Sequence, residues 1–211
     1  MGTMVKAGLL LFSFTVISIF LVATTQNDTK GLIQHNQEQL LLKRLGELTR
    51  DYDNDIVSDR YQKTVILHGV QQTLNIYPAK KANKTIAYLV EHTYPNGYSG
   101  DIRLLTGFDT EFKLLGVRVI AHKETPGLGD RIERKKSDWI LQFKGLSLAN
   151  PDKSLWRVKR DGGAFDQFTG ATITPRAIVS ATYQVLEYFQ THAIKWVRFW
   201  IAVIADCAKP T

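Results

Sequence analysis

One apolar stretch near the N-terminus constrains this chain more than any other segment. Residues 7–27 contain no charged side chain, and an apolar run of this length is sufficient to cross a bilayer once as a helix. A cleaved signal peptide is the alternative, with Ala23-Thr24-Thr25 as a weak cleavage site. Because the run is longer than the core of a typical signal peptide, the sequence predicts a retained transmembrane anchor.

The charges that flank this stretch give a slight preference for its orientation. Lys6 precedes the span, whereas Asp28 and Lys30 follow it. Basic residues are retained on the cytoplasmic side of a membrane helix. We therefore expect residues 1–6 in the cytoplasm, 7–27 in the bilayer and the main domain on the exported side.

Composition excludes several classes of protein. The chain has 211 residues and a formal net charge of +7, which membrane proximity explains simply. No zinc-ligand spacing or nucleic-acid recognition pattern is present, so we expect no nucleic-acid partner. Cys207 is the single cysteine, which rules out an internal disulfide framework and a multi-cysteine metal site. His92 and His122 are isolated beside predicted strands, and we expect neither to bind a metal.

Residue patterns after the anchor predict an α+β fold. Residues 34–48 are typical of an amphipathic helix and 50–60 of a loop, so 28–60 form a membrane-proximal segment. Alternating patterns begin at Tyr61 and predict a mostly antiparallel sheet with flanking helices. The clearest strands are 85–90, 102–105 and 114–120, with turns at 95–97 and 107–111. We expect one domain over residues 61–193.

The C-terminal segment, residues 194–211, is aromatic and apolar with basic residues among them. It is consistent with a last core helix. It is equally consistent with an interfacial helix that lies on the membrane or docks on a partner subunit, with its tryptophans at the level of the lipid headgroups.

Two loops between the strands carry turn signals. The first, residues 95–100, reads P-N-G-Y-S-G, and the second, residues 122–130, reads H-K-E-T-P-G-L-G-D. Pro126-Gly127 fits a type II turn, because proline presets the first position and glycine accepts a positive φ at the second. Taken alone, each loop is consistent with a simple hairpin connection.

A third segment, residues 161–176, reads D-G-G-A-F-D-Q-F-T-G-A-T-I-T-P-R. Thr174 is a good N-cap and Pro175 suits the first helical position, so a helix is expected to begin there. The loop before it points at a helix N-terminus, which favours a phosphate. Arg176, on the first turn, is placed to add a charge-assisted contact. The alternative is that these threonines only cap the helix.

Together, the three segments resemble a known family in their order and spacing. G-Y-S-G, E-T-P-G-L-G and D-G-G-x-F-D-Q-F-T-G-A-T-I-T-P-R look like the G subunit of Rnf-type electron-transport complexes. The C subunit of the sodium-translocating NADH:quinone reductase is similar in plan. The T-G-A-T core itself resembles the acceptor signature for covalent flavinylation.

This resemblance implies a role for each site residue. Thr172 would supply the hydroxyl oxygen of a phosphoester to FMN, and Asp166 would shape the loop or be recognised by a flavin transferase. In the second loop, backbone N–H groups would donate to the isoalloxazine edge while Leu128 packs on it. The implied cofactor-binding residues are Thr172, Thr169, Gly170, Ala171, Asp166, Glu124, Thr125, Gly127, Leu128, Gly129 and Arg176.

The resemblance also implies a function. It predicts a single-pass protein of the bacterial inner membrane with a periplasmic FMN-binding domain. The domain would carry electrons within a complex that couples electron transfer, from the ferredoxin or NADH side, to ion translocation. Its partners would be integral-membrane and iron–sulfur subunits, and a flavin transferase during maturation. The chain would be a redox subunit of a translocase rather than a stand-alone enzyme, and no hydrolytic constellation stands out.

Two other functions remain open from the sequence. One is a non-redox, membrane-anchored binding or assembly module, in which T-G-A-T only caps a helix. The other is a covalent flavoprotein that passes electrons to a soluble extracytoplasmic acceptor.

Overall fold

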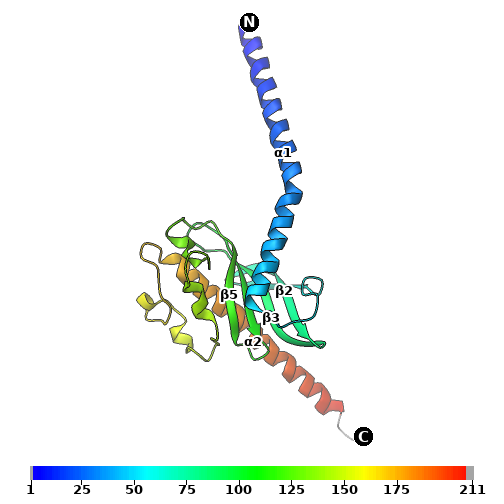
Figure 1. Cartoon of the computed structure of the whole chain (residues 1–211), viewed down its shortest axis with the longest axis vertical. Helices are drawn as coiled ribbons and strands as arrows, with labels where there is room; N and C mark the ends of the chain where they lie inside the picture. The colour runs from blue at the N-terminus through cyan, green and yellow to red at the C-terminus, as the bar shows by residue number, and fades with distance from the viewer. Residues whose placement is uncertain (1, 208–211) are drawn as a thin grey trace. The chain divides into compact units, whose positions relative to one another are not determined.

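The fold comes from a computed structural model that places residues 2–207 and describes the side chains of residues 2–26, 29–31, 36 and 39–192. Contacts divide the chain into two units, Met1–Lys43 and Arg44–Thr211. The first helix, α1, runs over Gly2–Leu48 (Figure 1). It therefore includes both the apolar stretch and the amphipathic segment that the sequence predicts.

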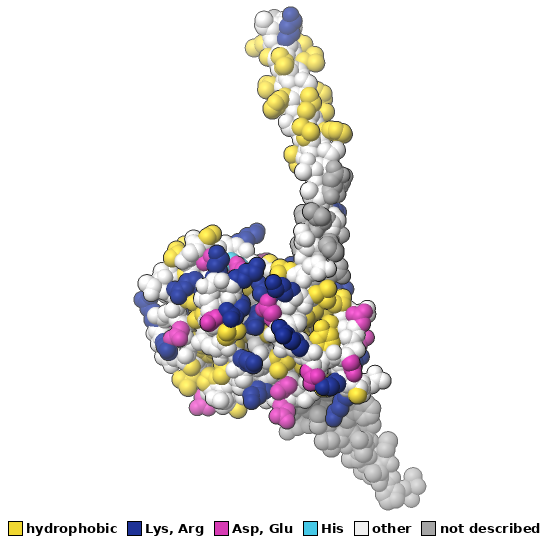
Figure 2. Space-filling view, viewed as in Figure 1, with side chains coloured by type: hydrophobic (Ala, Val, Ile, Leu, Met, Phe, Trp, Pro, Cys, Tyr) yellow, Lys and Arg dark blue, Asp and Glu magenta, His cyan; other side chains and the backbone are white. Residues whose placement is uncertain are grey.

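The first unit is helical and has the character of a membrane span. Residues Gly2–Gly31 form the one stretch of helix, within the described part of the chain, that is long and apolar enough to cross a bilayer. Its apolar side chains are exposed along its length (Figure 2). The hydroxyls of Thr15 and Thr25 donate to the carbonyls of Leu11 and Leu21, both at 2.8 Å. Such internal bonds satisfy polar groups that lipid leaves without partners.

The second unit contains an antiparallel sheet of five strands in sequential order. The strands are β1 (Tyr61–Leu67), β2 (Val70–Lys81), β3 (Lys84–Tyr94), β4 (Ile102–Asp109) and β5 (Leu114–Ala121). The predicted α+β class and the three clearest predicted strands are confirmed. One turn lies further along than expected, because β4 continues to Asp109 and includes Gly107.

The long helix α2 (Ile173–Cys207) packs on one face of this sheet. Phe108 of β4 and Phe189 of α2 meet with ring centroids 5.3 Å apart. Between β5 and α2 lie four short 3-10 helices, η1 (Gly129–Ile132), η2 (Trp139–Phe143), η3 (Lys153–Leu155) and η4 (Lys159–Asp161). Buried aromatic rings from this segment, such as Phe143 and Phe165 with centroids 4.9 Å apart, extend the core.

The predicted C-terminal helix continues α2 as far as Cys207. Side chains from residue 193 onward lie outside the described residues. Whether this segment docks on a membrane or a partner therefore stays a prediction.

The other face of the sheet receives the last turn of α1, where Leu45 and Leu48 are buried. Gly107 and Gly116 are paired across β4 and β5, and both lie against Leu48. A Cβ on Gly107 would stand 3.5 Å from the Leu48 side chain, and one on Gly116 only 3.0 Å. Gly116 also has a φ of +147°, which favours glycine. The two glycines thus leave the space in which the Leu48 side chain packs against the sheet.

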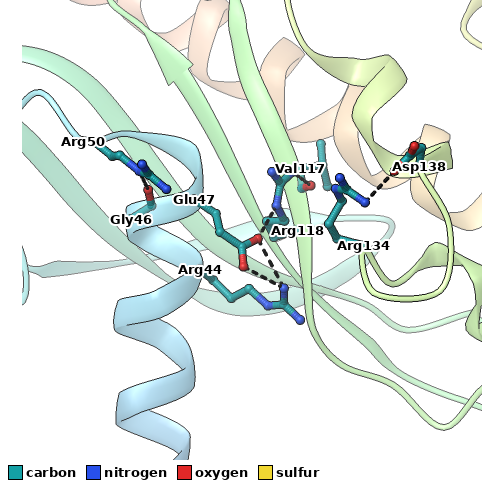
Figure 3. Close-up of polar contacts among 8 residues, drawn as sticks. All are labelled: Arg44, Gly46, Glu47, Arg50, Val117, Arg118, Arg134 and Asp138. Carbon is teal, nitrogen blue, oxygen red and sulfur yellow. Dashed lines mark hydrogen bonds and ion pairs between the residues drawn. The ribbon is translucent and has the colours of Figure 1, made fainter.

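An ion-pair network fixes the same helix turn to the sheet (Figure 3). Glu47 of α1 accepts hydrogen bonds from Arg44 at 3.2 Å and from Arg118 of β5 at 2.7 Å. Arg118 also donates to the carbonyl of Val117 at 2.8 Å. Burial alone would raise the pKa of Glu47. The hydrogen bonds and charges of Arg118 and Arg44 outweigh burial, so this pKa is lower than usual.

Substitution of Glu47 by glutamine tests the network. The variant leaves two largely buried guanidinium groups without a carboxylate, and we expect the domain to lose about 1–3 kcal/mol of unfolding free energy. Because the pKa of Glu47 is lowered in the fold, this loss is expected near neutral pH and shrinks as the pH falls below its ordinary value of 4.5. Urea unfolding of the full chain in detergent measures it. The exposed Glu111→Gln is the control, and equal midpoints for the two variants would contradict the assignment.

A second buried polar group, His92 of β3, lies within the core on the α2 side. Its Nε2 is 2.9 Å from the hydroxyl of Thr106, while its Nδ1 has no partner among the described residues. Burial, with a smaller contribution from His68, lowers the pKa of His92 to about 3. Burial likewise lowers the pKa of His68 to about 4. Both rings are therefore neutral in the folded protein at physiological pH.

These histidines predict acid sensitivity. The unfolded chain binds protons at both rings below pH 6.5, whereas the fold resists protonation until about pH 4 and 3. Stability should therefore fall with decreasing pH from about 6.5, by up to about 1.4 kcal/mol per pH unit for each ring. We expect His92→Gln to flatten this dependence between pH 6.5 and 4. The partly exposed His192→Gln is the control, and parallel curves for wild type and His92→Gln would refute the prediction.

Candidate cofactor-binding site

The three sequence motifs meet around one cavity of about 270 Å³. They come from the β3–β4 loop, from the loop after β5 and from the start of α2. The lining residues are Tyr98, Glu124, Thr125, Leu128, Gly129, Gly170, Ala171, Thr172, Ile173 and Thr174. Segments up to 76 positions apart in the chain (98 to 174) therefore form a single site.

Thr172 lies at the N-terminal end of α2, which begins at Ile173. The helix thus starts earlier than expected, and the prediction that Thr174 is its N-cap is wrong. Thr174 is buried, and its hydroxyl donates a short hydrogen bond to the carboxylate of Glu124. Pro175 is tolerated as the third helical residue, because N–H groups of the first turn have no acceptor within the helix.

The first turn of α2 presents hydrogen-bond donors and positive potential next to Thr172. The N–H groups of Ile173 and Thr174 have no earlier helical carbonyl to bond. The helix dipole adds partial positive charge at the same end. Because Thr172 directly precedes these groups and lines the cavity, an anion attached to its hydroxyl would be stabilised there.

The loop after β5 forms the predicted type II turn. The Leu128 N–H donates to the Thr125 carbonyl at 3.2 Å, and Gly127 has a φ of +78°. Gly129 and Asp130 donate to the same carbonyl at 3.0 and 3.4 Å. The backbone N–H of Gly127 lowers the pKa of the nearby Asp130 carboxyl. Most N–H groups of this loop are therefore used to hold its own shape.

Apolar side chains of all three segments remain exposed around the cavity. Tyr98 is 66% exposed, Leu128 44% and Ile173 43%. The Leu128 side chain lies 3.3 Å from where a Cβ of Gly170 would stand, and Gly170 has a φ of +84°. A planar aromatic ligand would cover such surface, and burial of that surface would favour binding.

Three of the predicted site residues lie away from the cavity. Arg176 forms a bidentate pair with Asp161 at 2.5 and 2.7 Å, and both line a second, open cavity of about 1140 Å³. Asp166 is exposed and pairs with Lys159 at 2.5 Å. Thr169 is exposed and does not line the cavity. Of the remaining eight predicted residues, all but Gly127 line it.

Sequence reasoning missed three residues of the cavity wall. Tyr98 has a sequence signal, since it is the second residue of the quoted G-Y-S-G segment. Thr174 looks like a cap in the sequence because its acceptor, Glu124, is 50 positions away in the chain. Ile173 has no local signal, because an exposed apolar residue at a helix start is ordinary.

Substitution of Gly97 tests how closely the β3–β4 loop packs at the cavity. A Cβ there would clash with the Gly100 carbonyl oxygen of the same loop, and it would stand 2.8 Å from a Glu124 carboxylate oxygen and 2.8 Å from the Ile102 side chain. We expect Gly97→Ala to cost about 1–3 kcal/mol of unfolding free energy, because overpacking displaces the loop. Gly46→Ala, in open space on α1, should be neutral or stabilising by up to about 1 kcal/mol. Thermal unfolding measures both, and an unchanged melting temperature for Gly97→Ala would argue against the packing described.

Comparison with known proteins identifies the class. The family model of the FMN-binding domain matches residues 97–187, which include all three motif segments and the cavity. The chain thus contains an FMN-binding domain that follows an apolar N-terminal helix. A second family model, of the RnfG N-terminal region, matches residues 1–48, which correspond to α1.

Whole-chain relatives identify the particular family. The G subunit of the ion-translocating oxidoreductase complex from Shewanella baltica is 42% identical over 195 residues, covering 90% of this chain and 91% of the relative. The same subunit from Pseudoalteromonas atlantica is 45% identical over 190 residues, covering 89% and 88%. That from Pseudomonas aeruginosa is 42% identical over 193 residues, covering 90% of each. The chain belongs to the family of G subunits (RnfG) of ion-translocating oxidoreductase complexes.

Membership confirms the resemblance that the motifs indicated. The chain is an FMN-binding subunit of a multi-subunit, membrane-bound Rnf complex for ion-translocating electron transport. Its N-terminal apolar helix is consistent with a membrane anchor in such a complex.

Proposed function

We propose that Thr172 carries FMN through a phosphoester and that the domain serves as an electron carrier within the complex. The N-terminal residues 1–6 are cytoplasmic, 7–27 span the bacterial inner membrane, and the FMN-binding domain is periplasmic. Electron transfer from the ferredoxin or NADH side is coupled to ion translocation by the assembled complex. Its iron–sulfur and integral-membrane subunits are the partners of this chain, and a flavin transferase modifies it.

The position of Thr172 is the observation that carries this proposal. The residue lines the cavity directly before the first turn of α2. It makes no side-chain hydrogen bond to any other described residue. A hydroxyl in this position is accessible for esterification, and the resulting phosphate meets the free donors of the helix N-terminus.

The cavity also fits the ring of a flavin. Tyr98, Leu128 and Ile173 supply exposed apolar surface around Thr172. Gly170, without a side chain, lets Leu128 lie close against the acceptor loop. When bound, FMN supplies reversible uptake and release of electrons, which none of the lining side chains provides. The chain's own residues hold and orient the cofactor and set its electrostatic environment.

The residues outside the cavity have separate roles. Asp166 is exposed just before the T-G-A-T core, and Thr169 is exposed at its first position, where a flavin transferase reads them. Arg176 holds Asp161, and a direct contact with the phosphate requires release of this pair. We therefore propose that Arg176 stabilises the segment before the acceptor loop through its ion pair with Asp161.

Replacement of the acceptor tests the proposal. We expect Thr172→Ala, made in cells that contain a flavin transferase, to lose all covalent flavin. Thr172→Ser retains a hydroxyl and should keep at least part of it. Intact mass and in-gel fluorescence of the denatured full chain measure the adduct.

Thr110→Ala is the control, an exposed threonine of the turn between β4 and β5 that lines neither cavity, and it should remain modified. Absence of any adduct on the wild-type chain, beside a control protein that is flavinylated, would favour the non-redox binding module. A flavinylated chain that purifies without membrane subunits would instead favour transfer to a soluble acceptor.

A further inference from the structure

We propose that the side chain of Glu124 is a positioning residue that ties the three motif loops together, and that its charge lowers the reduction potential of the cofactor. The second part rests on the proposed function. This role belongs to the Glu124 carboxylate and is separate from any hydrogen bond that the backbone N–H groups of the loop donate to the cofactor.

The carboxylate joins elements that are distant in the chain. Glu124 is 4% exposed. It accepts a hydrogen bond from the Thr174 hydroxyl on the first turn of α2, and its Oε1 accepts one from the Ser99 N–H of the β3–β4 loop at 3.1 Å. One side chain of the loop after β5 thus holds the other two segments of the cavity wall.

Two glycines make room for this carboxylate. A Cβ on Gly97 would stand 2.8 Å from its Oε1, and one on Gly129 would stand 3.0 Å from its Oε2. The Gly129 position is equally close to the Thr174 hydroxyl, at 3.0 Å. A Cβ on Gly97 would also clash with the Gly100 carbonyl oxygen, so Glu124 is one of the groups that require glycine there, whereas at Gly129 the close neighbours are Glu124 and Thr174.

The backbone of Glu124 is held from its other side. Its N–H donates to Nδ1 of His122 at 3.0 Å, and Nε2 of the same ring lies 2.9 Å from Glu133. A ring whose Nδ1 accepts carries its proton on Nε2, so His122 donates to Glu133. This chain of bonds limits the rotation of the loop, and it keeps the carboxylate directed at Thr174 and Ser99.

The charge of this carboxylate has little compensation. No ion pair in the described part of the chain includes Glu124, and its partners there are one hydroxyl and one backbone N–H. The N-terminus of α2 offsets part of the charge. The group lines the same cavity as Thr172, so its field acts directly on a cofactor attached there.

A fixed negative charge opposes reduction. Two-electron reduction of an oxidised isoalloxazine with uptake of one proton adds one negative charge to the cavity. The carboxylate repels that charge, and a charge near the ring is one of the ways in which proteins tune a flavin. Glu124 therefore favours the oxidised form.

Glu124→Gln removes the charge with little change of shape: its amide oxygen accepts from the Ser99 N–H, and its NH2 group donates to the Thr174 hydroxyl, which reverses that bond. We expect full-length flavinylated protein to show a higher midpoint potential in a mediated spectroelectrochemical titration. The equilibrium should shift about tenfold toward the reduced form, which is about 30 mV for a two-electron couple. Glu91→Gln is the matched control, a buried glutamate on β3 that lines neither cavity, and its potential should match wild type.

Thr174 provides an independent test of the tie between the loops. Thr174→Val removes the donor to Glu124, and we expect a reduced yield of covalent flavin on Thr172. Thr174→Ser restores the hydroxyl and should restore the yield. This pair decides the question if Glu124→Gln does not fold.

Each result has a distinct meaning. A flavinylated wild-type chain with an unchanged potential in Glu124→Gln would overturn the electrostatic role alone. Equal flavin yields in Thr174→Val and Thr174→Ser would overturn the positioning role. A wild-type chain that carries no flavin would instead overturn the proposed function, and with it the effect on potential.

Discussion

Antiparallel pairing of β4 with both of its neighbours is the constraint on which the cofactor site depends. Tyr94 pairs with Ile102 and Arg103 pairs with Ala121, so the end of β3, the start of β4 and the end of β5 lie at one edge of the sheet. The loops that follow β3 and β5 must therefore emerge side by side. Packing of α2 on the sheet then brings its first turn to the same place, and the three motifs form one cavity.

Within that edge, a single buried carboxylate connects the loops. Carboxylates are costly to bury, and they persist where hydrogen bonds satisfy them. Glu124 finds its donors in Thr174 and Ser99, and glycines at 97 and 129 leave the necessary space. The three motifs are thus parts of one packing arrangement, in which each depends on the others. The same arrangement places a negative charge beside the residue that we propose carries the cofactor.

The same strands β4 and β5 also hold the last turn of α1. Leu48 lies against the paired Gly107 and Gly116, several residues along each strand from the cofactor loops. Glu47 and Arg118 add charged hydrogen bonds at that point. Strands β4 and β5 therefore hold the helix end and also position the loops that line the cavity.

The sequence by itself determined what depends on local patterns. The apolar run of residues 7–27, the alternation in β3, β4 and β5, and the Pro126-Gly127 turn each follow from neighbouring residues, and the structure has them. The three motifs further identified the family. Only the tertiary structure decided which side chains meet. It showed that Thr174 bonds Glu124 instead of capping α2, that Arg176 pairs with Asp161, and that Gly107 belongs to a strand beneath Leu48. The physical reason is distance along the chain: a hydroxyl or a guanidinium takes the best acceptor that folding brings near, and that acceptor lies outside any local pattern.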